Sequence, residues 1–440
     1  MTTAGRVTPR EVLRLAAPAL VVLAAEPLYL LVDTAVVGHL GAVPLAALAV
    51  GGVVLAQAPT QFVFLSYGTT SRAARLHGAG RRAEAVVEGV QATWLALLAG
   101  TLLLALGQVF ARPLVTLLAG PGPVADAAVG WLRIALFGAP LVLVSLAGNG
   151  WMRGVQDTAR PMRYVLAGNG LSVLLCPLLV YGPGPLPALG LDGSAVANVA
   201  AQLVAAVLFV RALVVERVSL RPSRTVMRGQ LGVGKDLVVR SLAFQACFLS
   251  ATSVAARTSA ESAAAHQVVL QLWFFLVLVL DSLAIAAQSL VGAALGSGDA
   301  PRARAVAHQV TRYGLWFGLA LGVVFAAAEP VLPRLFTPDA AVLAQVPHAW
   351  WIFVALQPIA GVVFALDGVL LGAGDVAYLR TSTVLAAVIG FLPLVWVAML
   401  LGWGLLGIWA GLGAFMVARL GFVLTRARGD RWAVTGAVRA

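Results

Sequence analysis

Long apolar segments, separated by short polar or glycine- and proline-containing breaks, run through the whole chain. A helix needs about 20 predominantly apolar residues to cross the hydrocarbon core of a bilayer. Typical breaks lie at residues 182–185 and 296–299, and a longer polar segment at 216–235 divides the chain nearly in half. The pattern predicts twelve transmembrane helices, near residues 11–38, 44–76, 84–110, 124–150, 161–181, 193–215, 232–256, 263–295, 302–328, 341–370, 379–400 and 405–427.

Composition favours the same fold class, an all-α membrane protein. Hydrophobic residues make up 60% of the chain and charged residues 11%, whereas soluble domains carry about 25% charged residues. Cys176 and Cys247 lie in apolar segments, and their spacing predicts neither a disulfide framework nor a metal site. We therefore expect a multi-pass membrane protein without a cofactor.

The basic residues gather at alternate ends of the predicted helices. Of the 30 lysines and arginines, all but Arg112, Arg133, Arg257 and Arg334 fall on one side of the membrane. Loops rich in lysine and arginine are normally cytoplasmic. The asymmetry predicts that both termini and the central segment are cytoplasmic, in a plasma or inner membrane. It also accounts for the net charge of +12 without a nucleic-acid partner.

The two halves of the sequence repeat each other at an offset of 218 residues. Six helices per half, starting on the same side, predict a parallel repeat about an axis along the membrane normal. We expect an N-terminal lobe at residues 1–215, a cytoplasmic linker at 216–235 and a C-terminal lobe at 236–440. The clearest matches pair Pro140 with Pro358, Gly150 with Gly368, Gly154 with Gly372 and Asp157 with Asp375.

Two carboxylates, Glu26 and Asp33, lie in the first predicted helix. Seven residues span about two turns, so both lie near one face and about 10 Å apart along the axis. An ionised carboxylate in hydrocarbon is costly and normally faces a protein interior or a water-filled cavity. Burial disfavours the charged form, so proton binding is one role and a structural ion pair is another. At the 218 offset they face Phe244 and Ala251, so this chemistry belongs to one half.

Further polar or helix-weakening residues lie within the predicted spans. Pro18 and Pro27 favour a kink in the first helix, which makes both candidate hinge residues. Asp281 and Asp367 are carboxylates of the C-terminal half, for which ion-pathway and helix-bracing roles are both open. The charges predicted to lie deep in the membrane are therefore all acidic.

Four segments resemble the MATE (multidrug and toxic compound extrusion) family, and within it the DinF-like branch. These segments are Leu31–Gly41, Gly148–Pro161, Gln288–Asp299 and Asp367–Asp375. The resemblance covers nearly the whole chain. It implies a V-shaped transporter of two six-helix lobes that exports organic compounds in exchange for protons or sodium, with protons favoured here.

The resemblance also carries roles to individual residues. Asp33 matches the family's first-helix aspartate, and Pro18 matches the proline fifteen residues before it. Relatives have a second aspartate where this chain has Cys176, so Glu26 is a candidate replacement for that acid. Asn198 stands at the family's sixth-helix hydroxyl position. The polar residues expected around the substrate cavity are Tyr29, Thr34, Asn149, Asn169, Ser172, Cys176, Asn198, Asp281, Gln288 and Asp367.

Other functions fit the sequence less well. Residues 229–235 have the spacing of a phosphate-binding loop, but Asp236 follows where Ser or Thr should hold magnesium, and no strand precedes it. No hydrolase or zinc motif suggests an enzyme. The runner-up is a flippase for a lipid-linked precursor, which should offer deep cationic groups. We expect small organic substrates, including cations, contact with membrane lipids, and a monomer.

Overall fold

The computed structural model describes residues 8–184 and 187–438, and this part of the chain is helical with short connections. Its helices form twelve spans that are long and apolar enough to cross a membrane, as predicted. Arg6 and Pro185, used in the sequence-based topology, lie outside the described residues. The spans are α1 (Pro9–Gly38), α2 with α3 (Ala42–Gln61, Phe64–Gly78), α4 (Arg82–Ala119), α5 with η2 and α6 (Pro123–Ala135, Leu136–Gly138, Ala139–Gly154), α7 (Ala159–Tyr181), α8 (Leu191–Val215), α9 (Arg224–Thr258), α10 (Ala260–Gly296), α11 (Ala300–Ala328), α12 (Ala340–Gly372), α13 with η4 and α14 (Val376–Leu385, Ala386–Phe391, Leu392–Leu400) and α15 (Gly404–Arg428), and a short η3 (Pro333–Leu335) precedes α12.

Two helices extend well beyond their predicted bounds, and most of the others by a few residues. Helix α4 continues through Pro113 to Ala119, and α9 begins at Arg224 rather than near residue 232. The glycine-rich residues 229–235 therefore lie inside α9. Because backbone N–H groups inside a helix bond to carbonyls of the preceding turn, this segment is not a phosphate-binding loop.

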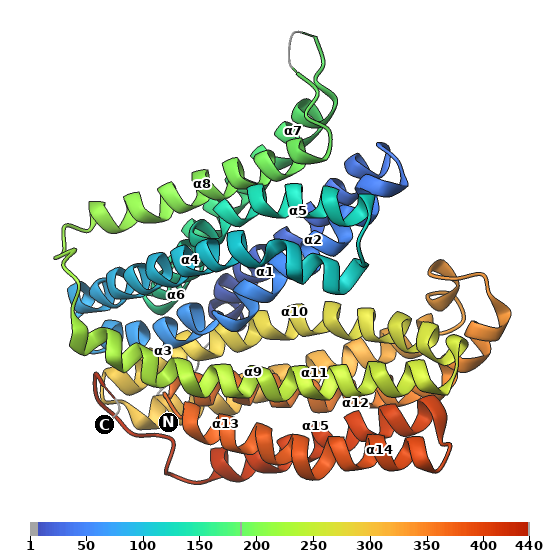
Figure 1. The fold of residues 1–440 in the computed structure, drawn as a ribbon. Coiled ribbons are helices and arrows are strands. Elements are labelled where there is room, and N and C mark those ends of the chain that lie inside the picture. The colour runs from blue at the N-terminus through green and yellow to red at the C-terminus, as the bar shows by residue number, and fades with distance from the viewer. Residues whose placement is uncertain (1–7, 185–186, 439–440) are drawn as a thin grey trace. The chain divides into compact units, whose positions relative to one another are not determined.

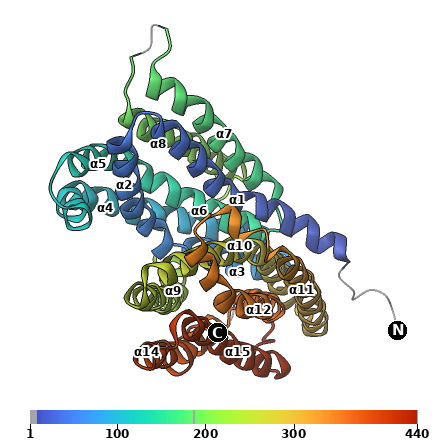
Figure 2. The same cartoon turned by 90° about the vertical axis from the view of Figure 1, so that its right-hand side faces the viewer.

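The chain folds into two compact units. The N-terminal unit is Ala17–Gly234, and the C-terminal unit combines Lys235–Ala440 with Met1–Ala16. Both boundaries fall inside continuous helices: in α1 next to Pro18, and in α9 next to Gly234. Within the N-terminal unit, α7 and α8 run side by side (Figures 1 and 2).

The segment before α9 packs on the N-terminal unit through side chains of α4. Gln91 donates to the carbonyl of Arg221 at 2.9 Å and accepts from the Ser223 N–H at 2.7 Å. The Trp94 indole donates to the Leu220 carbonyl at 2.9 Å. These bonds hold this connection against α4.

The sequence repeat reappears as repeated helix packing inside each unit. A Cβ on Gly100 would lie 2.3 Å from the Cα of Pro140, and a Cβ on Gly318 would lie 2.7 Å from the Cα of Pro358. Such distances permit only glycine, and both residues of the second pair lie 218 positions after those of the first. Two further close approaches follow the same offset: Gly150 and Gly154 to the carbonyls of Ser66 and Thr70, and Gly368 and Gly372 to those of Ala284 and Gln288.

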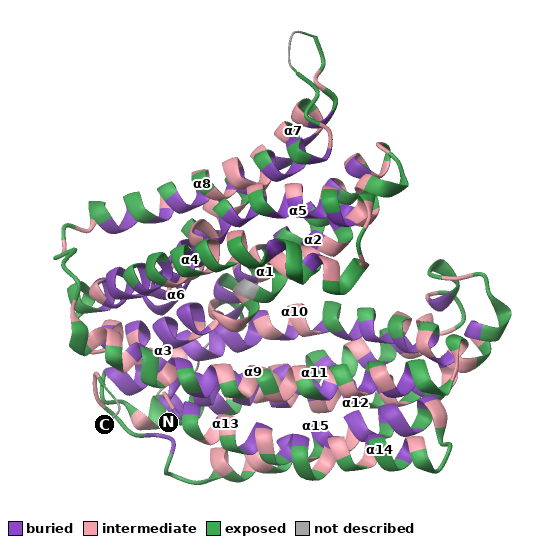
Figure 3. Ribbon diagram, in the orientation of Figure 1, coloured by how far each residue is buried: buried purple, intermediate pink, exposed green. Residues whose placement is uncertain are grey.

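Burial follows the pattern of a membrane bundle. Helices α10 and α12 have the largest buried share among the spans, whereas α4 carries many exposed residues (Figure 3). Leu98 and Leu117, for example, are 69% and 82% exposed. Exposed leucines on a transmembrane span fit contact with lipid, because lipid tails are as apolar as leucine.

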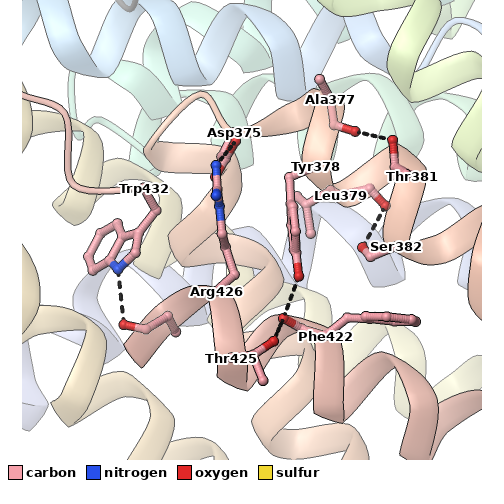
Figure 4. Close-up of polar contacts among 11 residues, drawn as sticks. Asp375, Ala377, Tyr378, Leu379, Thr381, Ser382, Phe422, Thr425, Arg426 and Trp432 are labelled. Atoms are coloured by element: carbon pink, nitrogen blue, oxygen red, sulfur yellow. Dashed lines mark hydrogen bonds and ion pairs between the residues drawn. The ribbon is translucent and has the colours of Figure 1, made fainter. Parts of the chain in front are cut away.

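Polar contacts join α12, α13 and α15 where the turn after α12 meets the end of α15 (Figure 4). Arg426 donates from Nε to Asp375 at 2.6 Å, and its guanidinium lies 4.7 Å from the centre of the Tyr378 ring. The Tyr378 hydroxyl donates to the Phe422 carbonyl at 2.8 Å. Beyond α15 the chain folds back, and the buried Trp432 donates to the Ala427 carbonyl at 3.0 Å.

Candidate functional site

A cavity of about 260 Å³ lies entirely within the N-terminal unit. Residues from α1, α2, α5, η2, α6, α7 and α8 line it, and most of them are apolar. Pockets for small organic molecules typically measure about 300–1,000 Å³, so this one suits a compact ligand. Its polar lining residues are Glu26, Tyr29, Asp33, Thr34, Trp131, Asn169, Asn198 and Gln202.

Asp33 is held in the cavity wall by groups from two other helices. Its side chain is almost fully buried, and the thiol of Cys176 on α7 donates to Oδ1 at 3.2 Å. The hydroxyl of Ser194 on α8 lies beside the carboxyl group. Ser194 in turn accepts the indole N–H of Trp131 on α5 at 2.9 Å. Asp33 therefore connects α1 to α7, and Ser194 beside it connects α8 to α5.

Tyr29 lies one turn before Asp33 on α1 and is also buried. Its hydroxyl lies against Ser172 on α7 and Asn198 on α8. The hydroxyl that α8 places beside Asp33 comes from Ser194, one helical turn before Asn198, and Asn198 itself lines the cavity. Asn198 lies beside Tyr29, so α7 and α8 face α1 at the levels of both Tyr29 and Asp33.

Glu26 lies in the same cavity but in a different environment. It lines the cavity and is exposed to it. Within the described part of the chain, Glu26 has neither a hydrogen bond nor an ion pair. The position opposite Asp33 where relatives have their second acid is filled by Cys176. Glu26 is therefore an uncompensated carboxylate of the cavity wall and is not in contact with Asp33.

Six of the expected cavity residues do not line the cavity. Two of them, Ser172 and Cys176, are buried on α7 beside Tyr29 and Asp33. Asn149 is buried on α6 but does not line the cavity. Asp281 is half-buried and Gln288 fully buried on α10, in the C-terminal unit. Asp367 belongs to α12 of that unit. The sequence therefore overestimated the polar lining of the cavity, because it assigned polar residues of both halves to one site.

Asp367 is neutralised by two arginines. Arg240 on α9 donates to Oδ2 at 2.5 Å, and Arg419 on α15 donates to the same oxygen. The guanidinium of Arg419 lies over the rings of Phe244 and Phe415, at 4.9 and 5.7 Å. Arg419 is 2% exposed, so the expectation that all deep charges are acidic was wrong. This cluster braces α9, α12 and α15.

Sequence reasoning missed Trp131, Ser194 and Gln202. Trp131 lies in an apolar segment, where tryptophan is typical of packing and interfacial belts. Ser194 and Gln202 lie in α8 among alanines and valines, with no motif that marks them. Only the structure identifies these three residues, because it shows that α5 and α8 lie at the cavity beside Asp33.

Comparison with known proteins agrees with this architecture. The family model described as MatE matches residues 18–178 and again 237–397. The chain is 36% identical to Protein DETOXIFICATION 44, chloroplastic, of Arabidopsis thaliana, over 93% of this chain and 80% of that protein. It is 30% identical to DNA damage-inducible protein F of Escherichia coli, over 89% and 86%.

A solved structure has the same fold over almost the whole chain. It is described as an outward-facing conformation of a multidrug resistance MATE family transporter of the MOP superfamily. The TM-score is 0.85 at 24% identity, covering 98% of this chain and 99% of that one. From the two family-model matches and the relatives together, the chain belongs to the MATE family of multi-pass membrane transporters, whose members are not enzymes.

Proposed function

We propose that this protein exports small organic compounds, including organic cations, by antiport against a coupling cation, and that the cation is the proton. The observation that carries the proposal is the acidic wall of the cavity. Asp33 is buried there among hydrogen-bond donors, and Glu26 faces the same space unpaired. No lysine or arginine is among the described residues that line the cavity. A cationic substrate and a proton would therefore compete for the same negative charge.

Antiport of this kind requires two states that differ in proton affinity. A coupling ion biases a two-state equilibrium only through its differential affinity for the two states. A tenfold difference in proton affinity between states corresponds to about 1.4 kcal/mol. We propose that the outward-open state favours protonated Asp33 and that the inward-open state releases the proton. Alternating access would then return the empty, protonated carrier.

We extend the proposal to the membrane topology and the oligomeric state. The basic residues favour cytoplasmic termini in a plasma or inner membrane. The 218-residue repeat favours lobes at residues 1–215 and 236–440 joined by residues 216–235, and we propose that the protein is a monomer. Cysteines placed at Ser223 and Gly184 would test the orientation. Labelling of Ser223→Cys from the inside and of Gly184→Cys from the outside supports it, and labelling of both from one side refutes it.

A flippase for a lipid-linked precursor is less well supported. A pyrophosphate-carrying substrate needs cations at its binding site. Arg240 and Arg419 are the buried cations of the C-terminal unit described above, and both already bind Asp367. The cavity itself presents carboxylates. Its charge therefore favours a neutral or cationic cargo over a pyrophosphate.

Transport into everted membrane vesicles tests the proposed function. Ethidium serves as the lipophilic cation, and pH and sodium gradients are imposed separately. We expect accumulation driven by an acid-inside gradient and little response to sodium. Accumulation that is indifferent to both gradients would refute antiport, and a response to sodium alone would refute the proton.

A further inference from the structure

Helix α11 in the C-terminal unit is basic along its first half. It carries Arg302, Arg304 and Arg312 and contains no acidic residue. Arg304 pairs with Asp430, which is exposed beyond the end of α15. Arg312 is exposed, and within the described residues its side chain has neither an ion pair nor a hydrogen bond.

Other arginines of this unit are neutralised inside the protein. Four of them, on α9, α13 and α15, bind carboxylates: Arg240 and Arg419 bind Asp367, Arg380 binds Asp236, and Arg426 binds Asp375. Arg312 differs from these four, because its charge is left for a group outside the chain.

Arg312 shares one face of α11 with His308 and Trp316, which lie one turn before it and one turn after it. At 3.6 residues per turn, the three side chains fall within about 80° of one another around the helix. All three residues are exposed, and Trp316 is 65% exposed. His308, like Arg312, has no side-chain partner within the described residues. We call His308, Arg312 and Trp316 the α11 face.

The α11 face changes from basic to apolar at Trp316. Farther along the helix, Leu319 and Val323 continue the same face and are 39% and 70% exposed. Exposed tryptophan is enriched where the headgroups of a membrane meet its hydrocarbon. Trp316 therefore marks the headgroup level, with Arg312 on the aqueous side and Leu319 and Val323 among the acyl chains.

We propose that the α11 face binds an anionic diacyl phospholipid, with the phosphate at Arg312 and His308 and an acyl chain along Leu319 and Val323. A guanidinium offers parallel N–H donors that match two phosphate oxygens, and an imidazole adds one more N–H. Basic residues at the headgroup level attract the anionic lipids of the cytoplasmic leaflet, which is the leaflet that the proposed topology gives to this end of α11. The lipid site is independent of the cavity and of the transport cycle.

Fluorescence quenching by brominated lipids tests the site in the reconstituted protein. The wild type and Trp316→Phe are placed in phosphatidylcholine vesicles with increasing fractions of phosphatidylglycerol brominated on its acyl chains, and the difference between them isolates Trp316. Brominated phosphatidylcholine is the reference lipid. We expect Trp316 to be quenched at a lower fraction of phosphatidylglycerol than of phosphatidylcholine, because only the former is anionic.

Arg312→Gln measures the contribution of the arginine, and Arg302→Gln is its matched control. Both residues are exposed on α11, but Arg302 lies about 80° away from Arg312 around the helix. The fraction of phosphatidylglycerol that gives half-maximal quenching should rise about fivefold in Arg312→Gln, the contribution of one basic residue near an anionic surface. It should stay unchanged in Arg302→Gln. Because the Arg312 side chain is exposed and unpaired, its loss leaves the fold intact.

Three results would overturn the lipid site. Equal quenching of Trp316 by the two brominated lipids would show that the α11 face has no preference for an anionic headgroup. Equal effects of Arg312→Gln and Arg302→Gln would show general attraction by charge instead of a site. Added glycerol phosphate, which has the phosphate without the acyl chains, should leave the quenching unchanged; if it reverses the quenching, Arg312 binds a free phosphate and not a lipid.

Discussion

Asp367→Asn should destabilise the C-terminal unit, because it removes the carboxylate that two buried arginines share. The side chains of Asp367 and Arg419 are 4% and 2% exposed, and that of Arg240 is 13% exposed. The substitution keeps the shape of the side chain but leaves two guanidinium charges facing each other with no counter-charge. It therefore isolates electrostatics from packing.

The expected cost follows from the burial of the three groups. Removing one partner of a buried ion pair typically costs about 3–5 kcal/mol, because the other charge remains buried and uncompensated. For a unit of this size, that corresponds to a fall in Tm of about 10 °C. Replacing all the charges of such a cluster by apolar residues of similar volume is often neutral or stabilising. The combination Arg240→Met, Asp367→Leu and Arg419→Met should therefore recover most of the loss.

Thermal unfolding of the purified protein in one detergent measures these differences. Asp430→Asn is the matched control, since Asp430 also pairs with an arginine, Arg304, but is 87% exposed. Exposed pairs contribute about 0–1 kcal/mol, so the control should change the Tm little. A Tm for Asp367→Asn that matches the control would refute the bracing role. A triple variant less stable than Asp367→Asn would show that the arginines act through contacts other than this cluster.

Three further predictions concern the cavity and the helices that enter it. Cys176→Asp should keep ethidium transport, since relatives have an acid at this position. Cys176→Val should impair ethidium transport, because it removes a hydrogen-bond donor to Asp33. Equal transport activity of the two variants would contradict the role of Cys176. Glu26→Gln should weaken transport of ethidium more than transport of an uncharged substrate, because it removes the unpaired carboxylate; a proportional loss for both would argue against it. Gly232→Ala should stabilise a straight α9 by about 1 kcal/mol and slow transport, if α9 bends at this glycine. Gly421→Ala on α15 is the control and should not slow transport, since a Cβ at either glycine meets nothing within 4 Å. Equal transport rates for the two variants would exclude bending of α9 at Gly232.

The sequence predicted the architecture well because membrane helices leave a strong local signal. Apolar length alone located the twelve spans. The 218-residue offset paired Gly150 with Gly368, and in the structure these glycines approach Ser66 and Ala284, which lie at the same offset. Helix ends were less accurate. The polar and glycine-rich start of α9 looks like a loop in sequence, and Pro113 looks like a helix end, yet both lie within helices.

The candidate site was only partly predictable. Asp33 stands out because a carboxylate in an apolar helix is costly, and Glu26 stands out for the same reason. The partners of Asp33 depend on which faces of α5, α7 and α8 meet α1, and no local pattern specifies that. Ser194 was missed for this reason. Arg419, counted as one of many cytoplasmic arginines, proved to be the buried counter-charge of Asp367.

The central claim is that the Asp33 carboxylate couples the proton gradient to export. The most direct measurement is ethidium accumulation in everted vesicles with an acid-inside gradient, per unit of protein, in Asp33→Asn and in the wild type. Asn keeps the size and hydrogen-bonding capacity of Asp but fixes a neutral state. We expect normal expression and membrane insertion with gradient-driven transport abolished. Full activity of Asp33→Asn would contradict the account and leave coupling to another carboxylate.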